Sequence, residues 1–261
     1  MSKSRIMSII IAILAVVIIA YVAMNRGNKT PHTAANTASG EVIIATEGGY
    51  MPFNGKKADG TLFGFDIDLG NALCAEMKRQ CKFVEQDWDG IIPGLKEKKY
   101  DAIMDGVSIT AERKQQINFS DPYFDNSLIV VGHKDKAVDA IEKIKDKNVG
   151  SQRATVSSKY MEDNHAKDWN AKLFDTQNAL YADFEAGRVD YIISDLAPVL
   201  DWMKDRTDVA VVGKIAIDDH FGIALRKEDT ELLAAFNTAL KTLRSNGTYD
   251  KIYATYFGAV K

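Results

Sequence analysis

The chain has 261 residues, of which 46% are hydrophobic and 26% are charged, which is an ordinary globular composition. The length fits one large domain or two smaller ones, because single cores stop growing at roughly 250–300 residues. Residues 1–39 hold four of the 33 basic residues and no acid, so 29 basic residues face 36 acidic ones in the remainder, a net charge of −7 that argues against a nucleic-acid partner.

The N-terminal segment carries an export pattern. Lys3 and Arg5 precede an uncharged run from Ile6 to Met24, which would span about 28 Å as a helix. Two interpretations of residues 1–24 stay open: a cleaved signal peptide, or an uncleaved membrane anchor, since no small-x-small cleavage site follows the run. The polar stretch 25–40 predicts a disordered linker, and without a cysteine here a lipidated N-terminus is excluded.

After Gly40, short β-rich runs alternate with helical patterns. Strands are predicted at 42–46, 82–86, 101–106, 128–133, 190–195, 209–213 and 221–226. Helices are predicted at 66–80, 89–98, 111–117, 137–146, 156–167, 177–187, 196–205, 230–246 and 248–257, with Asp66 as N-cap of the first. The alternation indicates an α/β fold with mostly parallel sheets.

The predicted strands fall into two groups that meet near residue 125. Asp125-Asn126 is one possible crossover, and a second lies near residues 215–220, before the last strand. We therefore expect two lobes, formed by residues 41–125 with 219–261 and by residues 126–218. Paired crossovers of this kind predict a ligand cleft between the lobes.

Cys74 and Cys81 are the only cysteines of the chain. An even count in an exported protein suggests a disulfide. On one continuous helix the two Cα atoms would lie about 10.5 Å apart, too far for the bond. A disulfide therefore requires the helix to end before Cys81, which the change from AEMKRQ to CKFVEQ allows. Two unpaired thiols are the alternative, and a metal site lacks a nearby histidine.

No enzyme signature stands out: the chain has no HExxH, Walker, GxSxG or dinucleotide-binding glycine motif. Long segments instead resemble the bacterial periplasmic binding proteins for polar amino acids of ABC importers, above all the lysine/arginine/ornithine, histidine and opine receptors. The segments are IATEGGYMPFN (44–54), GFDIDLGNALCAEM (64–77), WDGIIPGLKEKKYDAIMDGVSITAERKQQINFSDPY (88–123), DFEAGRVDYIISD (183–195), FGIALRKEDTEL (221–232) and SNGTYDKIYATYF (245–257).

The resemblance covers residues 41–261 and implies a two-lobed type II periplasmic binding protein that closes on its ligand. It also implies roles for single residues. Arg113, in the first turn after the N-cap Thr110, would bind the α-carboxylate of an amino acid. Asp195, at the end of a strand, would bind the α-ammonium group, although an N-cap role is the alternative.

Further residues are implied in the same way. Ser108 and the backbone of Gly106 would complete the contacts to the ligand's α-groups. Thr155 would bind the carboxylate at a helix start, although it also suits an N-cap. The family pattern has glycine just before this threonine, where Ala154 stands here, so the loop shape is left open.

The resemblance also implies a pocket for the ligand side chain. Glu47 would meet a distal cation, and Tyr50 and Trp88 would stack on a guanidinium or an alkyl stem. Glutamine-type receptors also carry an acid at the first position, so Glu47 alone does not decide the ligand. Asp105 stands where several basic amino-acid receptors have serine, and either a pocket or a sheet position is open for it.

Together these observations predict a receptor rather than an enzyme. We expect a monomeric, periplasmic protein that binds a cationic L-amino acid, arginine first, for an inner-membrane ABC permease, without cofactor or metal. An opine or another polar amino acid is the alternative ligand. A dehydratase-type enzyme on the same fold is a further alternative, but it needs an acid/base group beyond the ligand contacts.

Overall fold

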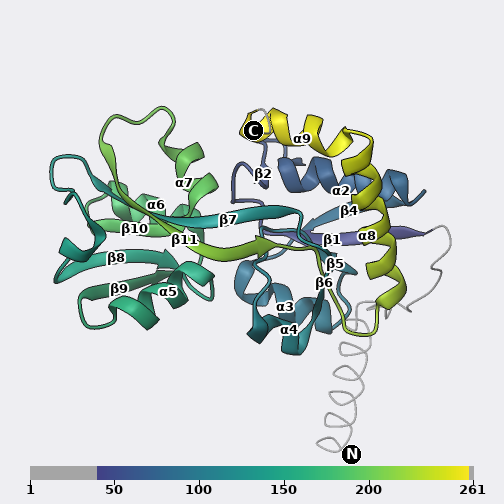
Figure 1. Cartoon of the computed structure of the whole chain (residues 1–261), viewed down its shortest axis with the longest axis horizontal. Coiled ribbons are helices and arrows are strands. Elements are labelled where there is room, and N and C mark those ends of the chain that lie inside the picture. Colours follow the sequence, from purple (N-terminus) through teal and green to yellow (C-terminus); the bar gives the residue numbers. More distant parts are fainter. Residues whose placement is uncertain (1–39, 259–261) are drawn as a thin grey trace, which may run out of the picture. The chain divides into compact units, whose positions relative to one another are not determined.

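A computed structural model describes residues 40–258 of the chain (Figure 1). The predicted signal peptide or anchor, residues 1–24, and all but the last residue of the predicted linker lie outside the described residues. Within residues 40–258, no helix has the length and apolar character needed to cross a membrane.

The first sheet has five strands in the order β4-β1-β5-β12-β6. β1 pairs in parallel with β4 and β5, whereas β12 pairs antiparallel with β5 and β6. The bounds of its strands are β1 (Glu41–Thr46), β4 (Gln80–Glu85), β5 (Ala102–Ile103), β6 (Asn118–Phe119) and β12 (Ala224–Leu225). A small hairpin, β2 (Gly55–Lys56) with β3 (Leu62–Phe63), follows β1.

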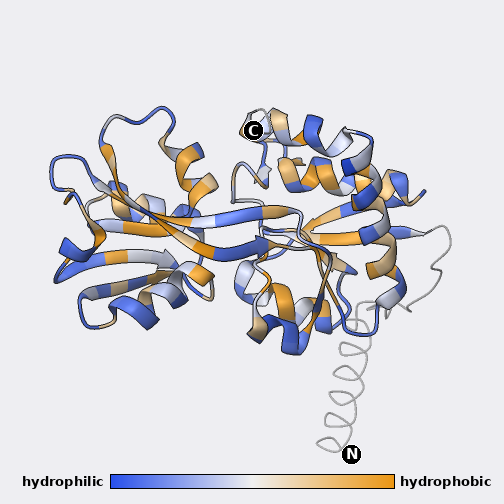
Figure 2. Ribbon diagram, in the orientation of Figure 1, coloured by the Kyte–Doolittle hydropathy of each residue, from blue (hydrophilic) through white to orange (hydrophobic). Residues whose placement is uncertain are grey.

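Helices cover both faces of this sheet because β1 is apolar on both sides. Val42 and Ile44 belong to one core cluster, and Ile43 and Ala45 to another, since alternate residues of a strand point to opposite faces. The first cluster packs against α2 (Phe65–Glu76), α8 (Thr230–Ser245) and α9 (Thr248–Phe257). The second packs against α3 (Trp88–Lys96), and the short α4 (Ala111–Gln116) follows β5. Figure 2 shows the apolar strands between more polar outer helices.

The second sheet has the order β11-β7-β10-β8-β9. β8 is parallel to β10 and β9, whereas β7 is antiparallel to β10 and β11. Its strands are β7 (Phe124–His133), β8 (Lys147–Gln152), β9 (Trp169–Phe174), β10 (Tyr191–Asp195) and β11 (Val209–Phe221). The helices of this part are α5 (Val156–His165), α6 (Gln177–Glu185) and α7 (Leu196–Met203).

Two long strands carry the chain between the sheets. β7 and β11 pair antiparallel and run side by side from one sheet to the other (Figure 1). At the end of β11, Phe221 forms a bridge with Ser108 of the first part. The type II two-lobed fold is confirmed, but its sheets are mixed rather than mostly parallel. Each sheet has two parallel and two antiparallel strand pairs, because β7 and β12, which follow a crossover from the other sheet, run opposite to their neighbours.

Some predicted elements were wrong in detail. The strands β8 and β9 were not predicted, because KNVGSQ and WNAKLF carry too many polar residues for an apolar run. The helix expected at 137–146 is only a 3₁₀ turn, Ile141–Lys143, whose N-cap Ala140 offers no side-chain acceptor. Asp66 is not an N-cap: the helix begins at Phe65, and Asp66 is buried and accepts a hydrogen bond from the Gly106 N–H.

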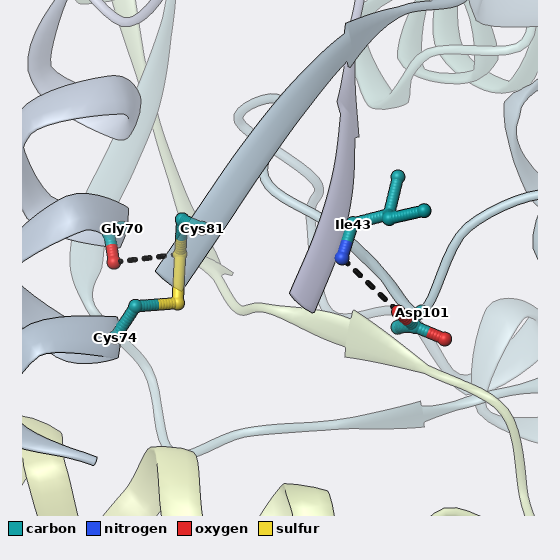
Figure 3. The surroundings of a disulfide bond; sticks show 5 residues. All are labelled: Ile43, Gly70, Cys74, Cys81 and Asp101. Carbon is teal, nitrogen blue, oxygen red and sulfur yellow. Dashed lines mark hydrogen bonds between the residues drawn. A yellow bond between two sulfur atoms is a disulfide. The ribbon is translucent and has the colours of Figure 1, made fainter. Parts of the chain in front are cut away.

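The predicted disulfide is present (Figure 3). Helix α2 ends at Glu76 and β4 begins at Gln80, so the chain turns before it reaches Cys81. This turn brings the Cα atoms of Cys74 and Cys81 to 5.7 Å. The bond joins α2 to the edge strand β4 of the first sheet.

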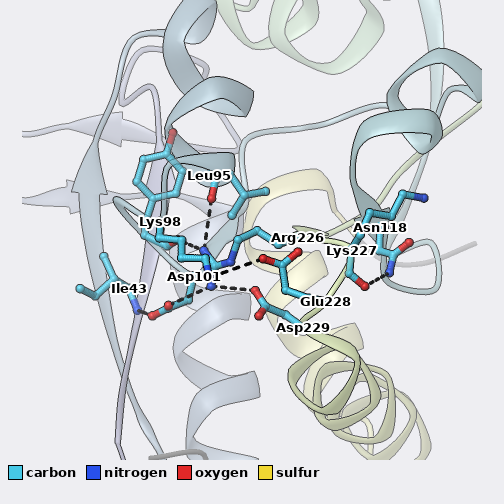
Figure 4. A network of polar contacts seen from close by, with 10 residues as sticks. Ile43, Leu95, Lys98, Asp101, Asn118, Arg226, Lys227, Glu228 and Asp229 are labelled. Atoms are coloured by element: carbon cyan, nitrogen blue, oxygen red, sulfur yellow. Dashed lines mark hydrogen bonds and ion pairs between the residues drawn. The ribbon is translucent and has the colours of Figure 1, made fainter. Parts of the chain in front are cut away.

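A buried arginine is the centre of a network of polar contacts in this part of the chain (Figure 4). Arg226 is 7% exposed, and its guanidinium donates to the carbonyl oxygens of Tyr100 and Leu95. It also pairs with Asp229 at 2.7 Å and Asp101 at 3.4 Å. Asp101 in turn accepts a hydrogen bond from the Ile43 N–H of β1, so one cation links the segments just before β5 and just after β12 to β1.

Candidate functional site

One small pocket lies between the part of the chain that carries the first sheet and the part that carries the second, and residues of both parts line it. All eight predicted site residues line it, together with three that were not predicted as ligand contacts. The pocket is lined by Glu47, Tyr50, Trp88, Asp105, Gly106, Ser108, Arg113, Gln152, Thr155, Val156 and Asp195. The structure therefore brings the predicted residues together, whereas their role in binding stays a prediction.

Arg113 is held by its helix and by two backbone carbonyls. Its N–H donates to the N-cap hydroxyl of Thr110 at 3.1 Å, which fixes the first turn of α4. Nη1 and Nη2 donate to the carbonyl oxygens of Ser108 and Ala154, both at 3.0 Å, and the guanidinium lies 5.1 Å from the ring centre of Trp88. Burial lowers the pKa of Arg113, but a guanidinium stays cationic at neutral pH. Its other N–H groups can hold an anion.

Asp195 directs its carboxylate into the pocket wall. It stands at the N-cap position of α7, but its side chain makes no capping hydrogen bond. Instead Oδ2 accepts from the Tyr50 hydroxyl and Oδ1 from Asn126 Nδ2 at 2.7 Å. Burial raises the pKa of Asp195 to about 6, and these hydrogen bonds oppose the rise. The group is mostly ionised at pH 7.

The sequence interpretation missed a buried polar pair on the crossover strands. Asp219 of β11 accepts hydrogen bonds from Ser108 Oγ at 3.0 Å and from Asn126 Nδ2 at 2.8 Å. Asn126 of β7 therefore joins Asp219 to Asp195. The only sequence signal was that two polar residues sit next to the predicted crossovers, where solvent exposure would explain them equally well.

Thr155 acts as a helix cap in this structure. Its hydroxyl donates to the Gln152 carbonyl oxygen at 2.7 Å and accepts from the Ser158 N–H at 3.2 Å, within a capping box. The N-terminus of α5 thus faces the pocket with its positive dipole end. The preceding Ala154 has φ of 56°, a left-handed conformation that suits glycine.

Two acidic residues form the other end of the pocket. Both oxygens of Glu47 lie 3.1 Å from Gln152 Nε2, a donor that belongs to the unpredicted strand β8. Burial, and then the nearby Asp105, raise the pKa of Glu47 to about 8. Asp105 lies in the pocket wall, which answers the question that its position in the sequence left open.

The charges of the pocket are unequal, with Glu47, Asp105 and Asp195 set against the one guanidinium of Arg113. Among residues 40–258, no group of three or more histidine, cysteine or acidic side chains is arranged for a metal ion. The arrangement suits a small molecule with one anionic group and more than one cationic or hydrogen-bond-donating group.

Comparisons with known proteins agree with this picture. A family model described as "Bacterial extracellular solute-binding proteins, family 3" matches residues 42–259. A protein of Escherichia coli K12 named "Putative ABC transporter arginine-binding protein 2" is 39% identical, over 85% of this chain and 92% of that protein. The histidine-binding periplasmic protein of the same strain is 37% identical, over 86% and 91%. The structure of an ancestral arginine-binding protein with arginine has a TM-score of 0.79 at 36% identity, over 84% of this chain and 98% of that one.

Proposed function

The chain belongs to family 3 of the bacterial extracellular solute-binding proteins, and from this premise we propose that it binds a free cationic L-amino acid, arginine first, for an ABC importer. It is a binding protein rather than an enzyme. The relatives named for arginine and for histidine are similarly distant, so their names alone do not choose the ligand. The charges of the pocket support the choice.

The α-groups of an amino acid match one end of the pocket. We assign its carboxylate to Arg113 and to the N-terminus of α5 at Thr155, because both offer donors with positive charge. We assign its ammonium group to Asp195, with Ser108 and Gly106 beside it. The Gly106 N–H is already bound to Asp66, so its carbonyl oxygen is the group left for the ammonium.

The choice of a cationic ligand rests on the acidic side chains of the pocket that the α-groups leave without a cation. Once Arg113 and Asp195 are paired with the two α-groups, the acids Glu47 and Asp105 are still without a cation, and a cation beside them would favour their ionised forms. A ligand with a positive side chain supplies that cation. Trp88 and Tyr50 then pack against its stem. An opine that contains an arginine side chain would supply the same cation and is the second candidate ligand.

We also propose that ligand binding closes two lobes, residues 41–125 with 219–261 and residues 126–218. Several of the pocket contacts join these two parts directly: Arg113 to Ala154, Tyr50 to Asp195, and Glu47 to Gln152. β7 and β11 connect the parts, so a small change in these strands would open the pocket, as in other hinged binding proteins. A ligand that touches both sides stabilises the closed form.

The location and partners follow from the same proposal. We expect a monomer in the periplasm, either released or tethered by residues 1–24, that delivers its ligand to an inner-membrane permease. Relatives of the chain include periplasmic proteins. Cell fractionation with N-terminal sequencing of the purified protein distinguishes the released form from the tethered one.

A binding screen tests the proposal. Thermal-shift measurements on the purified protein with the twenty amino acids, ornithine and octopine should show the largest shift with arginine, and mass analysis should recover the ligand unchanged. Glu47→Gln should weaken arginine but not its neutral isostere citrulline. Glu85→Gln is the control, since Glu85 pairs with Lys56 at the surface. Turnover of the ligand, or no amino acid bound, would refute the proposal.

A further inference from the structure

One carboxylate oxygen of Asp105 accepts several hydrogen bonds, whereas the other accepts none within the described part of the chain. The side chain is 3% exposed, and Oδ1 accepts three hydrogen bonds, from Thr46 Oγ1 at 3.0 Å, Glu47 N–H at 2.9 Å and Asn54 Nδ2 at 2.8 Å. Oδ2 is buried and has no hydrogen-bond partner within the part of the chain that is described, although Asp105 lines the pocket. Buried polar atoms without a partner are rare, so this oxygen calls for a donor from the pocket.

Glu47 presents a second carboxyl group at the same end of the pocket. Its backbone N–H is bound to Asp105, so the two side chains leave neighbouring points of the wall. Its oxygens share one donor, Nε2 of Gln152, and so keep acceptor capacity. Two carboxyl groups with unused acceptor capacity therefore belong to residues that line the same pocket.

Neither acid is fully ionised without a cation near it. Burial, the largest cause, together with neighbouring negative charge, raises the pKa of Asp105 to about 7 and that of Glu47 to about 8. The neighbouring acids that add to this rise come from two further elements: Asp66 of α2, and Asp87 and Asp89 at the start of α3. Arg113 is the cation in the lining, and Tyr50, Tyr100 and Tyr123 face Asp105 as neutral phenols.

We propose that Asp105 is a second specificity-determining residue, whose Oδ2 receives the side-chain cation of the ligand together with Glu47, and that cation binding releases protons from this pair to the solvent. The inference rests on the proposed function, because it assumes that an amino-acid side chain reaches this end of the pocket. A guanidinium has five N–H donors in one plane and can serve both carboxylates at once. A neutral side chain carries no positive charge that would stabilise the two carboxyl groups in their ionised forms, so it gains nothing from the second acid.

Two dependences follow for the intact protein. Arginine affinity should rise as the pH increases from about 6 to about 8, because the free pair loses its protons over this range and the cation binds the ionised form. Citrulline, which has arginine's shape without its charge, should show only the smaller rise that both ligands share through Asp195. Binding of arginine at pH 7 should release on the order of one proton more than binding of citrulline, since both ligands share the α-groups and any release from Asp195.

Calorimetry in two buffers of different ionisation enthalpy measures this release directly. Asp105→Asn is the decisive variant, because its amide oxygen can keep the three donors of Oδ1 while its NH₂ replaces Oδ2. It should weaken arginine roughly 10- to 100-fold, leave citrulline unchanged or tighter, and reduce the proton release. Asp121→Asn is the control: it makes the same change at an exposed acid that does not line the pocket. It should leave the arginine-to-citrulline ratio near that of the parent.

The outcomes separate the two proposals. If the parent binds arginine but releases no more protons than with citrulline, and Asp105→Asn keeps the parental ratio of affinities, the assignment of Asp105 is wrong while the proposed function stands. An equal loss for arginine and citrulline in Asp105→Asn would also overturn the assignment, because it would indicate a structural role alone. If the parent binds no amino acid, both proposals fail.

Discussion

Arg113→Ala is the perturbation that tests the binding site most directly. In the structure, two of the guanidinium nitrogens hold the carbonyl oxygens of Ser108 and Ala154, and the remaining donors are free for a ligand carboxylate. Removing one partner of a buried ion pair costs roughly 3–5 kcal/mol. The affinity should therefore fall about 100-fold to several thousand-fold, since 1.4 kcal/mol corresponds to a factor of ten.

The loss should be similar for every amino acid that the parent binds, because all share the α-carboxylate. Calorimetry with arginine and citrulline measures it, and Arg113→Lys, which keeps the charge but not the planar fork, should lie between the parent and the alanine variant. Lys114→Ala, which removes the exposed neighbouring cation on α4, is the control and should bind as the parent does. Near-parental affinity in Arg113→Ala would refute the carboxylate assignment, and with it most of the proposed site.

The remaining predictions concern stability. Replacing both Cys74 and Cys81 by serine should lower the free energy of unfolding by about 2–3 kcal/mol, because the disulfide closes only a short loop. Urea denaturation of the oxidised parent and the variant measures this, and equal midpoints would contradict it. Ala154→Gly should raise the free energy of unfolding by about 1 kcal/mol, because it relieves a left-handed alanine. In the matched variant Ala166→Gly, at a right-handed helix end, the same change should destabilise instead, and equal signs in the two variants would reject the strain argument.

The sequence predicted much of the site because its clues were local. Arg113 follows a good N-cap, and Asp195 ends an apolar strand, so neighbouring residues alone place each of them near a helix start or a strand end. The disulfide was predicted from the even cysteine count, on the condition that the helix stops before Cys81, and the structure contains it. The family resemblance then grouped these residues, and the structure brings all eight into one pocket.

What the sequence failed to predict depends on contacts between distant segments. The strand β8 carries Gln152, whose amide meets Glu47 from 105 positions away, and no local pattern marks either the strand or the contact. Asp219 and Asn126 are buried only because β7 and β11 pair at the crossover, whereas polar residues in a loop would look the same in sequence.

Asp105 shows most clearly what the sequence determines and what only the tertiary structure decides. Its place after an apolar strand is a property of the sequence, but which way its carboxyl group points is not. Thr46, Glu47 and Asn54, more than fifty positions earlier, donate to one oxygen, and the other is buried without a partner among the described residues. The sequence by itself determined most of the elements, because apolar period and capping act over a few residues, and its resemblance to known receptors gave the fold family. Only the tertiary structure decided which buried acids face a common space, because burial and the pairing of charges are set by segments that meet through folding.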